Sequence, residues 1–158
     1  MSRRIGMVLM VVLVGISATV YGQSAERMDA ILASDPFTFG DAAYLAVISA
    51  GLMDPEGEAS EALAVIVARA AEREHRDRYR NRDVGSPVTL GEFAYLMMIT
   101  HDISGGFWYR QVPGPRYAYR EFAHRRLVQG QSFPLQQISG ERAMRITGRV
   151  LSMREARP

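Results

Sequence analysis

The chain has 158 residues, with no cysteine and no lysine, and its 19 arginines exceed its 17 acidic residues by two. Without cysteine, the chain has no disulfide framework, no thiolate metal site and no lipidated cysteine. Arg3 and Arg4 account for the whole excess of positive charge, so the calculated basicity gives no reason to expect a nucleic-acid partner.

The first 22 residues have the pattern of a secretory signal peptide. Arg3 and Arg4 precede an uncharged apolar run over residues 5–20, and the small residues Val20 and Gly22 lie at positions −3 and −1 of a cut after Gly22. The alternative is an uncleaved anchor, but the run is shorter than the roughly 20 residues that span a bilayer. We therefore expect export to the periplasm or cell envelope, no stable membrane span after cleavage, and a mature domain over residues 23–158.

The charged residues are unevenly distributed over this mature domain. Residues 23–83 contain 12 acidic residues and 7 arginines, a net charge of −5, whereas residues 84–158 contain 10 arginines and 5 acidic residues, a net charge of +5. The two halves could attract each other within one domain, or the second half could leave a basic surface for an anionic partner.

Apolar residues recur at helical rather than strand spacing, which predicts an all-α fold. Prolines fall between the predicted helices or at their starts, where proline is tolerated. In chain order, we predict helices over residues 25–33, 40–52, 59–80, 90–103, 117–128 and 140–153.

Three of these helices begin with a hydroxyl residue followed by an acid. Thr89 and Glu92 predict a capping box, in which hydroxyl and carboxylate each bind a free backbone N–H, and Thr38 with Asp41 repeats it with a shorter acid. Ser139 is the expected cap of the last helix, one residue closer to its acid. Gly-acid pairs at 40/41, 91/92 and 140/141 are spaced by about 50 residues, which predicts three helix-loop-helix repeats. The alternative is three unrelated caps.

The last predicted repeat carries the clearest family pattern. An aromatic-Ala opening at Tyr117-Ala118 leads a first helix that ends with a hydrophobic residue and glycine, and Phe133-Pro134 follows in the loop before Ser139. This segment resembles the S-layer homology (SLH) module, most closely over residues 104–154 and in the second helices at 38–52 and 89–103. The resemblance implies a pseudo-threefold helical bundle that binds peptidoglycan or another cell-wall polymer through grooves between repeats.

One departure from the family pattern affects the expected ligand site. The family's Thr-Arg-Ala-Glu signature places an arginine directly after the cap, and here Phe39 and Leu90 occupy that position. In the third repeat the position falls on Gly140 when counted from Ser139, or on Ser139 when counted from Glu141. The resemblance therefore supports the scaffold better than the polymer site.

Two features suggest where an anionic glycan would bind. Residues 107–117 combine the only tryptophan with other aromatics, arginines and a Pro-Gly-Pro turn, a composition that suits sugar stacking and anion binding. The alternative is that Phe107 and Trp108 fill the core between repeats. Arginines at 142, 145 and 149 form one stripe on the last helix, either lining a positive groove together with those at 116 and 120 or lying solvated. The predicted ligand-binding residues are Trp108, Tyr109, Arg110, Arg116, Tyr117, Arg120, Arg142 and Arg145.

The sequence contains no recognisable catalytic constellation. His75, His101 and His124 lie outside any metal-type spacing, no glycine-rich phosphate loop is present, and Glu92 and Glu141 are expected to act in capping. We therefore predict no enzyme activity, no metal and no cofactor. The two hypotheses that remain are an envelope module that binds a cell-wall glycan polymer, and an envelope adaptor that binds a protein on the same scaffold.

Overall fold

The computed structural model describes residues 24–72, 79 and 81–156, and within them the fold is all-α, as the periodicity predicts. Pairing between extended segments is limited there to two isolated bridges, Thr38 with Pro87 and Thr89 with Gln137. The predicted signal peptide lies outside the described residues. After a helix at residues 24–33 come α2 (Phe39–Ser49), α3 (Ala59–Ala71), α5 (Leu90–Thr100), α6 (Phe107–Gln111), α7 (Pro115–His124) and α8 (Gly140–Glu155).

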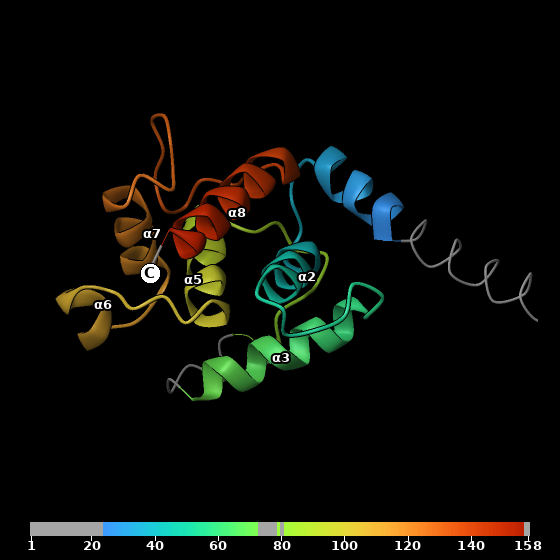
Figure 1. The fold of residues 1–158 in the computed structure, drawn as a ribbon, viewed down its shortest axis with the longest axis horizontal. Helices are drawn as coiled ribbons and strands as arrows, with labels where there is room; N and C mark the ends of the chain where they lie inside the picture. Colours follow the sequence, from blue (N-terminus) through green and yellow to red (C-terminus); the bar gives the residue numbers. More distant parts are fainter. Residues whose placement is uncertain (1–23, 73–78, 80, 157–158) are drawn as a thin grey trace, which may run out of the picture.

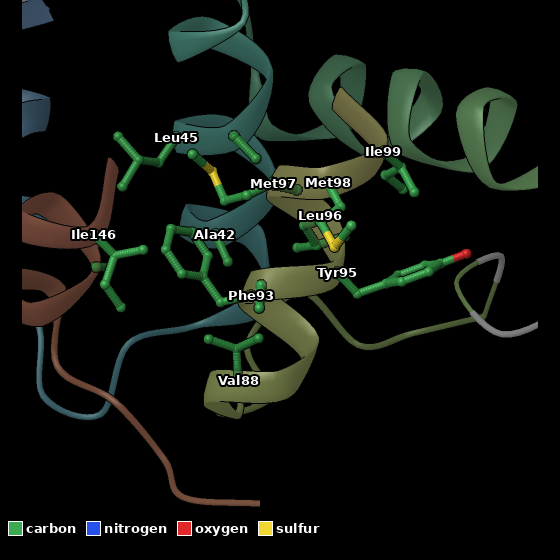
Figure 2. Packing of buried hydrophobic residues seen from close by; sticks show 14 of the residues in the cluster. Ala42, Leu45, Val88, Phe93, Tyr95, Leu96, Met97, Met98, Ile99 and Ile146 are labelled. Atoms are coloured by element: carbon green, nitrogen blue, oxygen red, sulfur yellow. The ribbon is translucent and has the colours of Figure 1, made fainter. Parts of the chain in front are cut away.

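Helices α2 and α5 lie side by side at the centre of the molecule, with α8 across one side and α3 along the other (Figure 1). Every residue of α5 except Glu92 is buried, as are eight of the eleven residues of α2. Side chains of α5 project in several directions around its axis (Figure 2). A helix that is apolar on all sides belongs in a core, which explains why these two segments carry almost no charge.

Several predicted helices extend three or four residues too far, because their last turns end in left-handed residues. The chain turns at Gly51, Asp102 and Arg126, whose φ angles are 71°, 49° and 58°. In each case the next residue donates a backbone hydrogen bond to the carbonyl five residues before it. These bonds are Leu52 to Val47 at 3.1 Å, Ile103 to Met98 at 3.0 Å, and Leu127 to Phe122 at 2.9 Å. The apolar residues that suggested a longer helix fold back against it instead.

The start of one predicted helix and the end of another also differ from the structure. Helix α7 begins at Pro115 rather than at residue 117, with the proline in the first turn, where its missing N–H has no cost. Helix α3 ends at Ala71, and of the predicted extension to residue 80 the segments 73–78 and 80 lie outside the described residues. The short helix α6 was not predicted, because five residues are too few to show a helical period.

The predicted caps are present at the starts of α2, α5 and α8. Thr89 Oγ1 accepts from the Glu92 N–H at 3.3 Å, and Glu92 Oε2 accepts from the Thr89 N–H at 3.0 Å, which completes the capping box. Thr38 accepts from the Asp41 N–H at 3.2 Å, but the shorter carboxylate binds the threonine hydroxyl instead of its amide. Ser139 accepts from the Arg142 N–H at 3.4 Å, so the third position of α8 holds an arginine where α2 and α5 hold an acid.

The amides that open these three helices donate to carbonyls of neighbouring segments in a cyclic order. The first N–H of α2 donates to Ser86, which precedes α5, and that of α5 donates to Gln136, which precedes α8, both at 2.8 Å. The first N–H of α8, from Gly140, donates to Ser34, which precedes α2, at 2.9 Å. Each helix start is therefore satisfied by the connection that leads into another of the three, and the cycle closes.

Glycine is required where these segments cross. A Cβ atom at Gly91 would lie 2.9 Å from the Pro134 carbonyl oxygen and 3.0 Å from that of Pro115. A Cβ atom at Gly140 would lie 1.6 Å from the Ile31 carbonyl oxygen, which leaves no space for any side chain. The regular glycines in the sequence therefore mark close approaches of backbone to helix start.

Candidate functional site

The arginine stripe of α8 lines one pocket. Arg142, Arg145 and Arg149 project beside Gln129, Gly130 and Ile146 around a volume of about 320 Å³. We call this the arginine pocket. Its lining contains three guanidinium groups and no carboxylate. Such a set of fixed donors suits an anion with several oxygens, such as a phosphate or a carboxylate.

Local hydrogen bonds hold two of these guanidinium groups in place. Arg149 donates to the Leu127 carbonyl at 3.0 Å and to Gln129 Oε1 at 2.7 Å, while Arg142 donates to the Gln129 carbonyl at 3.4 Å. Arg145 forms an ion pair with Glu141 at 3.1 Å, and both side chains are more than half exposed. Glu141 is thus the partner of an arginine, and the prediction that it acts in capping is wrong. The exposed pair can open at little cost, which leaves Arg145 available to a ligand.

A second concavity, the α5–α7 groove, lies between the starts of α5 and α7 and has a volume of about 770 Å³. Its charged lining residues are Arg82, Arg116 and Glu92, and Arg82 forms an ion pair with Glu92 at 3.3 Å. Pro115, Pro134 and the 78% exposed Leu135 give the groove an apolar wall. The mixed lining suits an amphipathic partner better than a plain anion.

The aromatic stretch at 107–117 is divided between core and surface. Tyr109 is 4% exposed and lies 6.2 Å from the Tyr95 ring, whereas Phe107 and Trp108 are 60% and 58% exposed. The expectation that Phe107 and Trp108 fill the core is therefore wrong, because α6 turns them outward and turns Tyr109 inward. Arg110 is exposed beside a pocket of about 530 Å³ that Tyr109 also lines.

The predicted ligand residues do not form one site. Arg142 and Arg145 line the arginine pocket, Arg116 lines the α5–α7 groove, and Arg110 lies beside Tyr109. Tyr117 is half-buried on α7, and the Arg120 guanidinium lies 6.0 Å from its ring centroid. The expectation of one groove lined by arginines 116, 120, 142, 145 and 149 is wrong, because Arg116 belongs to a different concavity.

His101 lies in a buried polar contact that joins α2, α5 and α8. It caps α5, where Arg154 of α8 donates to Nδ1 at 2.9 Å and Nε2 lies 3.0 Å from Ser49 Oγ at the end of α2. Because a guanidinium can only donate, Nδ1 accepts and Nε2 carries the proton. Burial, with help from the Arg154 charge and against the opposing effect of Asp102, lowers the pKa of His101 from 6.5 to about 4.

Comparison of the chain with protein-family models, with characterised proteins and with solved structures finds no match. The function must therefore be argued from the chain's own residues. Within the described ranges, no helix is long and apolar enough to cross a membrane, and no three histidine or acidic side chains lie close enough together to hold a metal ion.

Sequence reasoning missed the residues that complete each site from distant loops. Gln129 accepts a hydrogen bond from Arg149, and Arg82, in the segment before α5, forms an ion pair with Glu92. Neither Gln129 nor Arg82 belongs to a periodic pattern. The ion pairs between the two charged halves have the opposite polarity to the net charges of these halves. In the described residues they join Arg69 to Asp102 and Arg82 to Glu92, so arginines come from the acidic half. Arg110, Arg116, Arg120 and Arg126 of the basic half are exposed.

Proposed function

We propose that this protein is a non-catalytic cell-envelope module that binds an anionic cell-wall polymer. We further propose that it is exported by the signal peptide at residues 1–22 and folds as three SLH-like helix-loop-helix units around a pseudo-threefold axis. The polymer's phosphate or carboxylate groups bind at the arginine pocket. The single observation that carries the ligand proposal is the convergence of Arg142, Arg145 and Arg149 on a pocket whose lining contains no acid.

The scaffold proposal is supported by the cyclic hydrogen bonds of the three helix starts. Thr38, Thr89 and Ser139 cap α2, α5 and α8 in the same way, 51 and 50 positions apart. The cap at Ser139 also favours one of the two alignments of the third unit. Gly140 then occupies the position of Phe39 and Leu90, where the SLH signature has arginine.

Loss of that signature arginine argues for a ligand site at a new place in the fold. Phe39, Leu90 and Gly140 are all buried at the first position of their helices, so none can meet a ligand. The arginine pocket instead lies between α8 and the residues that precede it, within one unit. Polymer binding on this chain thus uses helix-face arginines rather than the grooves between units that the resemblance implies.

The test is co-sedimentation of the purified protein with isolated cell-wall material. We expect the wild-type protein to pellet, and Arg142→Gln with Arg145→Gln to bind at least roughly tenfold more weakly, because each lost charged contact contributes about 1.5–3 kcal/mol. Arg126→Gln, an exposed arginine on the same half of the chain, is the matched control and retains binding. Wall material stripped of phosphodiester polymers, and material with blocked carboxyl groups, identify the anion. Equal pelleting of the double variant and the control would reject the arginine pocket.

An adaptor function is the second candidate, and the α5–α7 groove favours it. Leu135 is 78% exposed at its edge and Phe133 nearby in the chain is 60% exposed, an unusual cost for a surface that meets only water. This candidate predicts that one envelope protein co-purifies with the chain while wall material does not. Leu135→Ser would then release the protein partner, because it removes the exposed apolar side chain at the groove edge.

A further inference from the structure

Helix α6 presents an apolar ridge to solvent. Phe107, Trp108 and Val112 are 60%, 58% and 56% exposed, and we call these three residues the aromatic ridge. An α-helix turns about 100° per residue, so Phe107 and Trp108 project about 100° apart, and Val112 follows as the C-cap of the helix. Tyr109 lies on the buried side. The helix lies at an outer edge of the molecule, beside α7 (Figure 1).

The ridge is held in place by specific contacts beneath it. Tyr109 is buried against Tyr95 of α5, and the Gly106 N–H at the start of α6 donates to Glu121 Oε1 of α7 at 2.9 Å. Glu121 is in turn paired with Arg125 at 3.6 Å. The fold therefore fixes α6 with its apolar side outward, although an apolar residue exposed to water gains nothing from that position.

Most charged residues in the sequence on either side of the ridge are arginines. Residues 103–130 contain five arginines and one acidic residue, Glu121, which is already paired with Arg125. Arg110, Arg116 and Arg120 are exposed. Glu72 and Asp102 line the pocket that Tyr109 and Arg110 also line, and Asp102 is paired with Arg69. An apolar tip within a cationic surface is the pattern that binds an anionic bilayer surface.

We propose that the aromatic ridge inserts into the interface of a membrane rich in anionic phospholipids, while arginines from the flanking sequence bind the headgroups. This function goes beyond polymer binding and uses a different part of the surface. The ring geometry favours lipid over sugar. Phe107 and Trp108 meet edge to face, with an interplanar angle of 79°, so they offer no common flat surface on which a sugar could stack, and Val112 adds an aliphatic group. A second copy of the chain would bring like-charged arginines together.

The only tryptophan of the chain is Trp108, so its fluorescence reports on the ridge alone, even when other segments of the full chain touch lipid. The experiment titrates the full chain with vesicles of phosphatidylcholine containing about a third phosphatidylglycerol, and with pure phosphatidylcholine vesicles. We expect a blue shift of the emission and quenching by brominated acyl chains with the anionic vesicles, both reduced by added salt. Binding to pure phosphatidylcholine vesicles should be at least roughly tenfold weaker, because each arginine near an anionic surface increases the affinity about fivefold.

Two variants separate the apolar and the charged contributions. Phe107→Ser with Val112→Ser retains Trp108. It should weaken vesicle binding roughly tenfold or more, because the apolar surface that these two side chains would bury in the membrane is lost. Arg110→Gln with Arg120→Gln should remove most of the preference for anionic vesicles. Leu32→Ser with Val84→Ser, which removes two exposed apolar residues elsewhere, is the matched control and should bind vesicles like the wild type.

Three results would overturn the proposal. The first is an emission spectrum that anionic vesicles leave unchanged. The second is a blue shift caused by soluble wall glycan without lipid, which would assign the ridge to sugar binding. The third is a blue shift that appears with rising protein concentration alone, which would assign it to self-association. None of these readings depends on the arginine pocket, so the wall co-sedimentation and the vesicle titration can fail independently.

Discussion

His101 makes the stability of the fold depend on pH in a defined window. The side chain is 6% exposed, and its pKa falls from 6.5 to about 4 in the folded chain. Between these values the unfolded chain binds a proton that the folded chain does not, so the free energy of unfolding rises with pH and becomes constant above about 6.5. The difference of the two pKa values corresponds to about 3 kcal/mol in total, of which somewhat less than half is already lost at pH 5.5.

Urea unfolding at several pH values between 4 and 7.5 measures this effect, with His101→Gln as the reference. The pH dependence that the two proteins share cancels in their stability difference, so what remains of it reports on the imidazole. We expect this difference to change by roughly 3 kcal/mol across the window. Arg154→Gln removes the neighbouring charge and should raise the pKa of His101, which moves the loss of stability toward higher pH. A stability difference independent of pH would refute a buried neutral His101.

Two further predictions concern the starts of the central helices. Gly140→Ala should unfold the protein or lower its stability by more than about 3 kcal/mol, because the new Cβ would meet the Ile31 carbonyl. Gly148→Ala on the same helix has open space and should raise the stability by up to about 1 kcal/mol. Thermal unfolding followed by circular dichroism compares the two variants, and similar melting temperatures would contradict the close approach at Gly140. Thr89→Ala removes the hydroxyl of the capping box and should cost about 1–2 kcal/mol, measured by urea unfolding. Thr38→Ala should cost less, because Asp41 does not complete the box, and an equal loss would show that the second hydrogen bond of the box adds nothing.

The sequence predicted the helices and their caps because both follow from local chemistry. The apolar runs of α2 and α5, the hydroxyl residues before them and the glycines at their starts are all visible in a single chain. The ends of α5 and α7 were placed too late because Asp102 and Arg126 adopt left-handed conformations that neither residue type announces. Glycine at residue 51 does indicate such a turn, so an end of α2 before residue 52 could have been predicted from the sequence.

The candidate sites were less predictable than the fold. The stripe of Arg142, Arg145 and Arg149 could be read from its spacing, because the helix itself places them on one face. The other sites depend on which loops meet, and so Gln129 and Arg82 could not be anticipated. The orientation of Phe107 and Trp108 depended on a single-turn helix, and aromatic content alone suggested burial rather than exposure.

The cyclic contacts also constrain when the protein can fold. The partner of the Ser34 carbonyl is the amide of Gly140, which lies 106 residues later in the chain. At a synthesis rate of about 5–20 residues per second, that amide emerges roughly 5–20 s after Ser34. Until then the contacts of α2 with α8 cannot form, so the cycle of helix starts closes only after nearly the whole chain has been made.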